Sequence, residues 1–262
     1  MNISDRSNAT VLISAIESTG AAAPKIAAAY ARAVKISEAA KSLSVPQDAL
    51  AIAVFAALEA GRDPGADEEV RRVLALNAVA NPGITTAVDA QAFETFRGVC
   101  RTSSATVIKA LRVPFDAAAV TLAGAHALIG DVPLEDTATI VARGGAAADA
   151  WARATGAVRV IDAALTGWQA LGTITGTSSS DRRYRVLRLA EVDYSTWVDR
   201  ELEGSKMKVW DVVRAGLTLS LPTVTEYRER VAVITAAEAN LERLDQQAGQ
   251  DRMTGRIPAA VR

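Results

Sequence analysis

Histidine and cysteine are almost missing from the sequence, which holds His126 and Cys100 as single copies. One cysteine cannot form an intrachain disulfide, and one histidine with one cysteine cannot fill a tetrahedral zinc site without unusual help from carboxylates. A Ser-His-Asp or Cys-His triad would have to use His126, and no G-x-S-x-G nucleophile motif accompanies it. We therefore predict no catalytic residues, no metal ligands and no cofactor, so the chain is not expected to be an enzyme. His126 is interpreted as a satisfied histidine within a helical bundle.

Excess charge and long apolar runs are also missing. The formal net charge is −1, so no global electrostatic attraction draws the chain to nucleic acid or to an anionic membrane. The longest apolar run, residues 49–58, is too short to span a bilayer, and the polar start of the chain lacks the apolar core of a signal peptide. We expect no membrane partner and a cytoplasmic location, or a virion if the source is a phage.

Aromatic residues make up only 5% of the chain, whereas 50% of it is hydrophobic and alanine dominates that half. This composition favours closely packed helices over a sheet sandwich, which needs bulky layers. We predict an all-α fold with at most a short strand near 184–189. Glycines and serines interrupt the helical pattern at 172–183, so we expect a helical domain over 1–171, a linker over 172–183 and a C-terminal helical segment over 184–262.

Two stretches resemble each other at an offset of 68 residues, "KSLSVPQDALA" from Lys41 and "KALRVPFDAAA" from Lys109. Each proline suits the first turn of a helix, so we predict duplicated helix-corner-helix units around Pro46 and Pro114; a chance match in an alanine-rich chain is the alternative. A DNA-reading helix-turn-helix is disfavoured, because the helix after Pro46 is apolar nearly all round, as a buried helix would be. The predicted core residues are Leu43, Val45, Leu50, Val54, Leu111, Val113 and Val120.

A long final helix is predicted after Pro222, where Thr223 and Glu226 form a capping box, and Gly249 marks its end. Apolar residues recur along it at three- and four-residue steps, which predicts a protein-interaction seam. We expect this seam to pack within its own chain, with contact to a second chain as the alternative, and we expect the tail beyond Gly249 to reach a partner. The seam residues are Tyr227, Val231, Ile234, Leu241 and Leu244.

Basic residues gather at two places, beside the linker and on one face of the helix that holds Lys25, Arg32 and Lys35. Two functional hypotheses follow. The first is a non-catalytic interaction or assembly protein that contacts copies of itself or a larger particle, such as a phage virion, because the alanine, arginine and aspartate usage indicates a GC-rich bacterial or phage source. The second is a nucleic-acid-associated regulatory protein. Its possible contacts beside the linker are Arg182, Arg183, Arg185 and Arg188.

Overall fold

The computed structural model describes residues 3–42, 46, 48–80, 82–177, 183–204 and 206–253. Within these residues the chain is helical and has no strand, so the fold is all-α as predicted. The elements in chain order are α1 (Ile3–Thr19), α2 (Pro24–Ser42), α3 (Ala49–Glu59), α4 (Glu68–Val79), α5 (Pro82–Ile129), α6 (Thr137–Ala142), α7 (Gly145–Thr175), the 3-10 helix η1 (Arg185–Arg188), α8 (Tyr194–Asp199), α9 (Val209–Arg214) and α10 (Val224–Met253).

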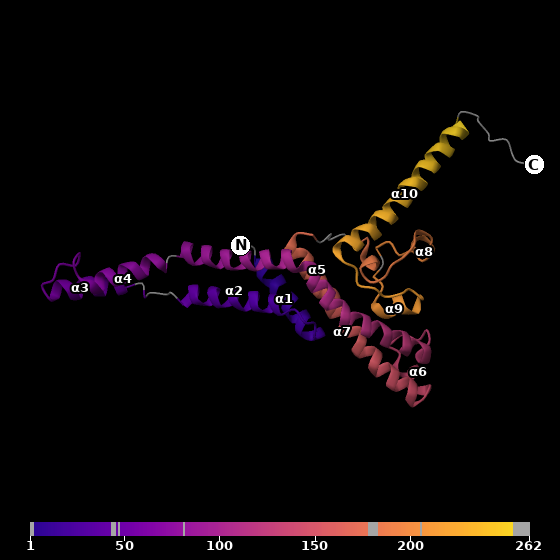
Figure 1. The fold of residues 1–262 in the computed structure, drawn as a ribbon, viewed down its shortest axis with the longest axis horizontal. Coiled ribbons are helices and arrows are strands. Elements are labelled where there is room, and N and C mark those ends of the chain that lie inside the picture. Colours follow the sequence, from indigo (N-terminus) through magenta and orange to yellow (C-terminus); the bar gives the residue numbers. More distant parts are fainter. Residues whose placement is uncertain are drawn as a thin grey trace, which may run out of the picture.

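The molecule is elongated, and Figure 1 shows a long arm on one side and α10 projecting on the other. We define the arm as α2, α3, α4 and residues 82–101 of α5. Here α2 lies along α5, and Phe93 and Phe96 of α5 are buried together with Ala33 of α2. The outer part of the arm, residues 48–80, is the α3–α4 hairpin and is called the tip below.

The central bundle consists of α1, α7 and residues 102–129 of α5, which pack against one another. Small residues let α1 and α7 approach closely, because a Cβ added at Gly167 of α7 would lie 2.9 Å from the Cβ of Ala15 in α1. Large side chains fill the remaining space, and Leu12, Leu111 and Ile161 are all fully buried. This bundle is the main hydrophobic core and the support for both projections.

The C-terminal elements pack onto the same core, which extends from Ala9 to Ile234. Helix α7 continues through residues 172–175 and ends at Gly176, whose φ of 72° is left-handed and suits glycine. Residues 178–182 of the predicted linker lie outside the described residues, and the division into two domains stays a prediction. The short strand considered near 184–189 is not formed, because residues 185–188 wind into η1, in which Val186, Leu187 and Arg188 are buried. An isolated antiparallel bridge joins Ala190 to Leu219.

The predicted corner at Pro114 is wrong, because Pro114 lies inside the continuous helix α5. Proline removes one backbone hydrogen bond from a helix, and here a helical stripe of core contacts continues through it: Leu111, Phe115 and Leu122 are fully buried. Pro46 instead lies between α2 and α3, so the two prolines have unlike settings and the duplicated units are not supported.

The predicted core list is corrected by the same geometry. Leu111 is confirmed as core, whereas Val113 and Val120 face away from the stripe and are 69% and 74% exposed. Leu50 and Val54 are partly buried. Leu43 and Val45 lie outside the described residues.

Candidate functional site

The predicted interaction seam on α10 is divided by the structure. Tyr227 and Ile234 are buried against the chain's own core, and Val231 packs beside them. Leu241 and Leu244 are 47% and 61% exposed on the part of α10 that projects from the body (Figure 1). The first half of the helix is therefore a docking element of this fold, and the second half presents a free surface.

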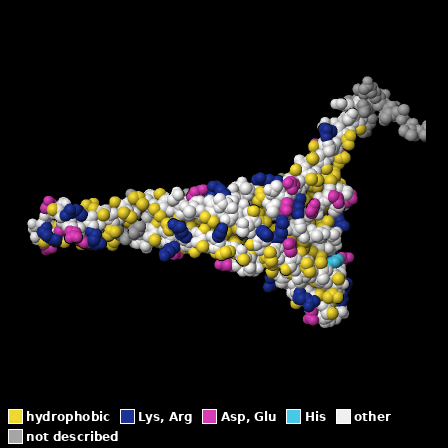
Figure 2. All heavy atoms as spheres, in the orientation of Figure 1, with side chains coloured by type: hydrophobic (Ala, Val, Ile, Leu, Met, Phe, Trp, Pro, Cys, Tyr) yellow, Lys and Arg dark blue, Asp and Glu magenta, His cyan; other side chains and the backbone are white. Residues whose placement is uncertain are grey.

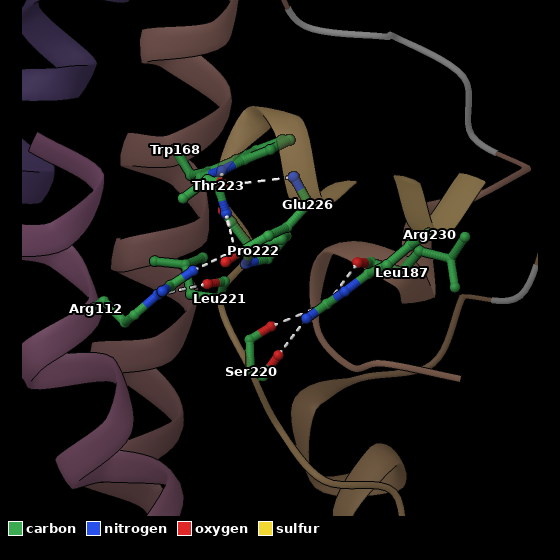
Figure 3. A network of polar contacts seen from close by, with 9 residues as sticks. All are labelled: Arg112, Trp168, Leu187, Ser220, Leu221, Pro222, Thr223, Glu226 and Arg230. Atoms are coloured by element: carbon green, nitrogen blue, oxygen red, sulfur yellow. Dashed lines mark hydrogen bonds and ion pairs between the residues drawn. The ribbon is translucent and has the colours of Figure 1, made fainter. Parts of the chain in front are cut away.

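A network of polar contacts fixes the start of α10 (Figure 3). The predicted capping box is confirmed: the Glu226 N–H donates to Thr223 Oγ1 at 3.1 Å, and the Thr223 N–H donates to a Glu226 carboxylate oxygen at 2.6 Å. Arg112 of α5 donates from Nε to the Leu221 carbonyl at 2.9 Å and pairs with Glu226. Trp168 of α7 donates from its indole to the Pro222 carbonyl at 2.7 Å. Two helices of the central bundle thus hold the segment that precedes α10.

Arg230, one turn further along α10, donates to the Leu187 carbonyl at 3.0 Å and to Ser220. Burial lowers the pKa of Arg230. The pKa of Glu226 is also lowered, first by the backbone N–H of Thr223 and then by Arg112. The charged groups of Arg112, Glu226 and Arg230 thus join α10 to the segments beside it, and these contacts set the direction of the helix.

An open cavity of about 440 Å³ lies beside this network. Asp116 of α5, Glu191 and Glu229 of α10 line it together with Arg112 and Arg230. Neither at this cavity nor elsewhere in the described part of the chain is there a group of three His, Cys, Asp or Glu side chains that could hold a metal ion.

The described arginines beside the linker have unlike surroundings. Arg183 pairs with Glu203 at 2.8 Å and with Glu238 of α10 at 2.6 Å. Arg188 is buried over the ring of Tyr227, 5.7 Å from its centroid, whereas Arg185 is exposed. Arg182 lies outside the described residues. Arg183 and Arg188 bind other parts of the chain, the Arg183 side chain is still 39% exposed, and contact of these arginines with nucleic acid stays a prediction.

His126 and Cys100 are separate in the fold. His126 Nε2 lies 3.0 Å from Asp131 and its ring meets Trp210 edge-on, so its partners lie near the end of α5. Cys100 is fully buried between arm helices, and burial raises its pKa to about 12. Within the described residues, neither side chain belongs to a group of three His, Cys, Asp or Glu that could hold a metal ion.

The largest departure from the sequence-based expectations is at the tip. Helix α3 was expected to be a buried core helix, but only Ala53 and Ala57 of it are buried, together with Val70 and Val73 of α4, and Leu50 and Val54 pack beside them partly buried. The larger side chains Ile52, Phe55 and Leu58 point outward, and Figure 2 shows hydrophobic side chains spread over this end of the molecule. The exposed large apolar residues of the arm are Ile36, Ile52, Phe55, Leu58, Leu74, Leu76, Val79, Ile84 and Val88.

The sequence contains the signal for this arrangement. Alanines four residues apart allow two helices to approach closely, and they then occupy the seam between the helices. Phe55, which lies between Ala53 and Ala57 in the sequence, faces outward. A helix that is apolar all round is buried in many proteins, and an exposed apolar surface of this extent marks an interaction site.

No helix in the described part of the chain is both long and apolar enough to cross a membrane. Comparisons of the chain with protein-family models, curated proteins and solved structures gave no significant match.

Proposed function

We propose that the chain is a non-catalytic helical assembly protein that associates with copies of itself through the outer faces of its projections. The observation that carries this proposal is the inverted arrangement of the tip, where Phe55 is 67% exposed while Ala57 is fully buried. A hairpin built in this way leaves its largest apolar surface to water, which is unfavourable for an isolated chain. Contact with other protein would cover it.

The same proposal accounts for the two halves of α10. The first half is anchored by the contacts of Arg112, Trp168 and Arg230, and this anchoring gives the second half a fixed direction. Leu241 and Leu244 are then presented away from the body for contact with a neighbouring subunit. A component of a multi-subunit particle such as a phage virion, or a cytoplasmic assembly, fits such a shape.

Light scattering after gel filtration tests the proposal, because the chain has a mass of 27.4 kDa. We expect the mass of the wild-type protein to exceed this value and to rise with concentration, and Phe55→Ser to return it towards 27.4 kDa. Val141→Ser is the matched control, since Val141 is 60% exposed on α6, away from the arm. A wild-type chain that keeps the mass of one subunit at every concentration would overturn the proposal.

Nucleic-acid binding is a second proposal, and it is supported by the basic face of α2 rather than by the linker arginines. Lys25, Arg32 and Lys35 are exposed on this helix. If they hold a phosphate backbone, affinity for DNA or RNA should fall steeply with added salt. Fluorescence anisotropy with a labelled oligonucleotide at low and high salt tests this, and the absence of binding at low salt would overturn it.

A further inference from the structure

A shallow groove of about 280 Å³ runs between α2 and α5 on the arm. Apolar side chains line most of it, four of them alanines, and Arg32 is the one charged residue among those that line it. The apolar lining includes Ala28, Ala29, Ala33, Ile36, Phe96 and Val99. A groove of alanines on one helix is suited to large side chains from another, since large and small residues interdigitate at well-packed helix contacts.

The tip carries a ridge that suits this groove. Ile52, Phe55 and Leu58 follow one another at three-residue steps on α3 and are 60%, 67% and 59% exposed. They lie within one stripe of the helix, and no charged residue occurs between 49 and 58. The ridge spans about 9 Å and the groove residues of α2 span about 12 Å at 1.5 Å per residue, so the ridge fits within the groove.

Charges flank the ridge and the groove at matching distances. Asp48 and Glu59 are exposed at the two ends of the ridge, and they share its helix face because they lie four residues from Ile52 and Phe55 respectively. On α2, Lys25 precedes the groove residues by three positions and Lys35 adjoins Ile36, the last of them, and both lysines are exposed. The acidic pair is separated by about 16 Å and the basic pair by about 15 Å along their helices.

The balance of charge over the whole arm agrees with this pairing. Helix α2 has four basic residues and one acidic residue, a net charge of +3, and the tip has six acidic and three basic residues, a net charge of −3. None of the four basic residues of α2 forms an ion pair in the part of the chain that the structure describes. Two tips side by side would repel, whereas a tip against the α2 of another copy would attract.

We infer that two copies of the chain pack their arms in opposite directions, each seating its α3 ridge in the α2–α5 groove of the other. This inference rests on the proposed self-association and specifies its geometry. Such a contact is isologous, because a twofold axis produces ridge-to-groove contact twice. The groove and the ridge lie on opposite sides of the α2–α3 junction along the arm (Figure 1), so the axis passes near that junction. Ile84 and Val88, at the start of α5, are 46% and 37% exposed, and we expect the same contact to cover them.

Reciprocal charge reversal tests the inference. One variant carries Asp48→Lys and Glu59→Lys, and the other carries Lys25→Glu and Lys35→Glu. Each alone should associate at least about tenfold more weakly than the wild type, because like charges then face each other. An equimolar mixture should form a mixed dimer with affinity near that of the wild type, since each ridge then meets a groove of opposite charge. Sedimentation velocity measures the association of each variant and of their mixture, and circular dichroism checks that every variant is folded.

Cross-linking supplies a second measurement that does not depend on charge. Cys100 is fully buried and its pKa is raised to about 12, so it should not react with a maleimide. A mixture of Phe55→Cys and Ala28→Cys chains should be joined by a short bifunctional maleimide, whereas a mixture of Val141→Cys and Ala28→Cys chains should not.

The outcomes separate this inference from the proposed function. A wild-type protein that stays a monomer overturns both. A wild-type oligomer that is insensitive to both reversals, or whose reversed chains fail to recombine, overturns the antiparallel contact and leaves self-association in place. If Lys25→Glu with Lys35→Glu abolishes binding of an oligonucleotide and leaves the mass unchanged, the basic face serves nucleic acid and the inference is wrong.

Discussion

The central bundle and the tip are built from similar alanine-rich helices, yet they place their large side chains oppositely. In the bundle, Leu111 and Phe115 are fully buried, whereas at the tip Ile52 and Phe55 are mostly exposed and Ala57 is inside. Buried apolar area contributes roughly 25 cal/mol per Å², so a seam of alanines stabilises much less than a seam of leucines. The bundle therefore supplies stability, and the tip supplies surface. The predictions below test whether buried and exposed positions divide in this way, and each compares a packed position with an open one.

The largest expected effect comes from a charge placed in the docked half of α10. Ile234 is fully buried, so Ile234→Asp should lower the free energy of unfolding by about 4 kcal/mol or more and release the C-terminal elements. Leu241→Asp, seven residues further along and 47% exposed, should leave stability within about 0.5 kcal/mol and reduce the mass of any oligomer. Urea denaturation and light scattering measure the two quantities. Equal loss of stability in both variants would contradict the division of this helix.

The second prediction compares one leucine from each region. Leu111→Ala should cost about 2–5 kcal/mol, because it leaves a cavity beside α7 and α1. Leu58→Ala, at a side chain that is 59% exposed, should change the free energy of unfolding by about 0.5 kcal/mol or less. Thermal melts at low protein concentration, where association is weakest, give the comparison. A large loss for Leu58→Ala would mean that the tip stabilises the fold itself.

The sequence predicted what depends on local rules. The helical class follows from composition, and the Thr223–Glu226 capping box follows from the spacing of two side chains that bind each other's backbone. Burial of Leu111 was also correct. These features require no knowledge of which helix packs against which.

The errors arise where tertiary contacts decide. Pro114 predicts the start of a helix from the sequence alone. In the structure α5 continues through Pro114, because Leu111 and Phe115 on either side of it are held in the core. The apolar character of α3 reads as burial, but the inward face of a hairpin is chosen by how closely its helices approach, which periodicity alone does not reveal. The signal for the exposed ridge at Phe55 is the pair Ala53 and Ala57, because the close approach of α3 and α4 at these alanines leaves no room for Phe55 between the two helices.

The third prediction tests the close approach of α1 and α7 in the central bundle. Gly167→Ala would place a Cβ 2.9 Å from that of Ala15, which is fixed to its backbone and cannot rotate away, so we expect a loss of about 1–3 kcal/mol. Gly156→Ala lies on the same helix α7, and no atom lies within 4 Å of its added Cβ. This control should instead stabilise the protein by about 0.5–1 kcal/mol through helix propensity. Chemical denaturation of the two variants measures the difference.

The smallest expected effect concerns pH and the ion pairs of the two regions. The pKa of Glu226 is lowered from its ordinary value of 4.5 by the Thr223 N–H first and by Arg112 after it. A lowered pKa in the folded state stabilises the protein above about pH 4.5, and this contribution is lost as the pH falls through the folded-state value. Because the Glu226 side chain is 45% exposed, solvent screens it, and Glu226→Gln should cost about 1 kcal/mol or less at neutral pH.

That difference between the wild type and Glu226→Gln should shrink as the pH falls below about 4.5, where the wild-type carboxylate becomes protonated as well. Glu69 on the tip is the matched control, because its pKa is lowered by Arg72 but the pair is solvent-exposed on α4 and joins no other element. We expect Glu69→Gln to have no measurable effect on unfolding at any pH. Urea denaturation of the three proteins from neutral to acidic pH gives the result. A Glu226→Gln curve that stays parallel to that of the wild type throughout would show that the Arg112–Glu226 contact does not anchor α10 through its charge.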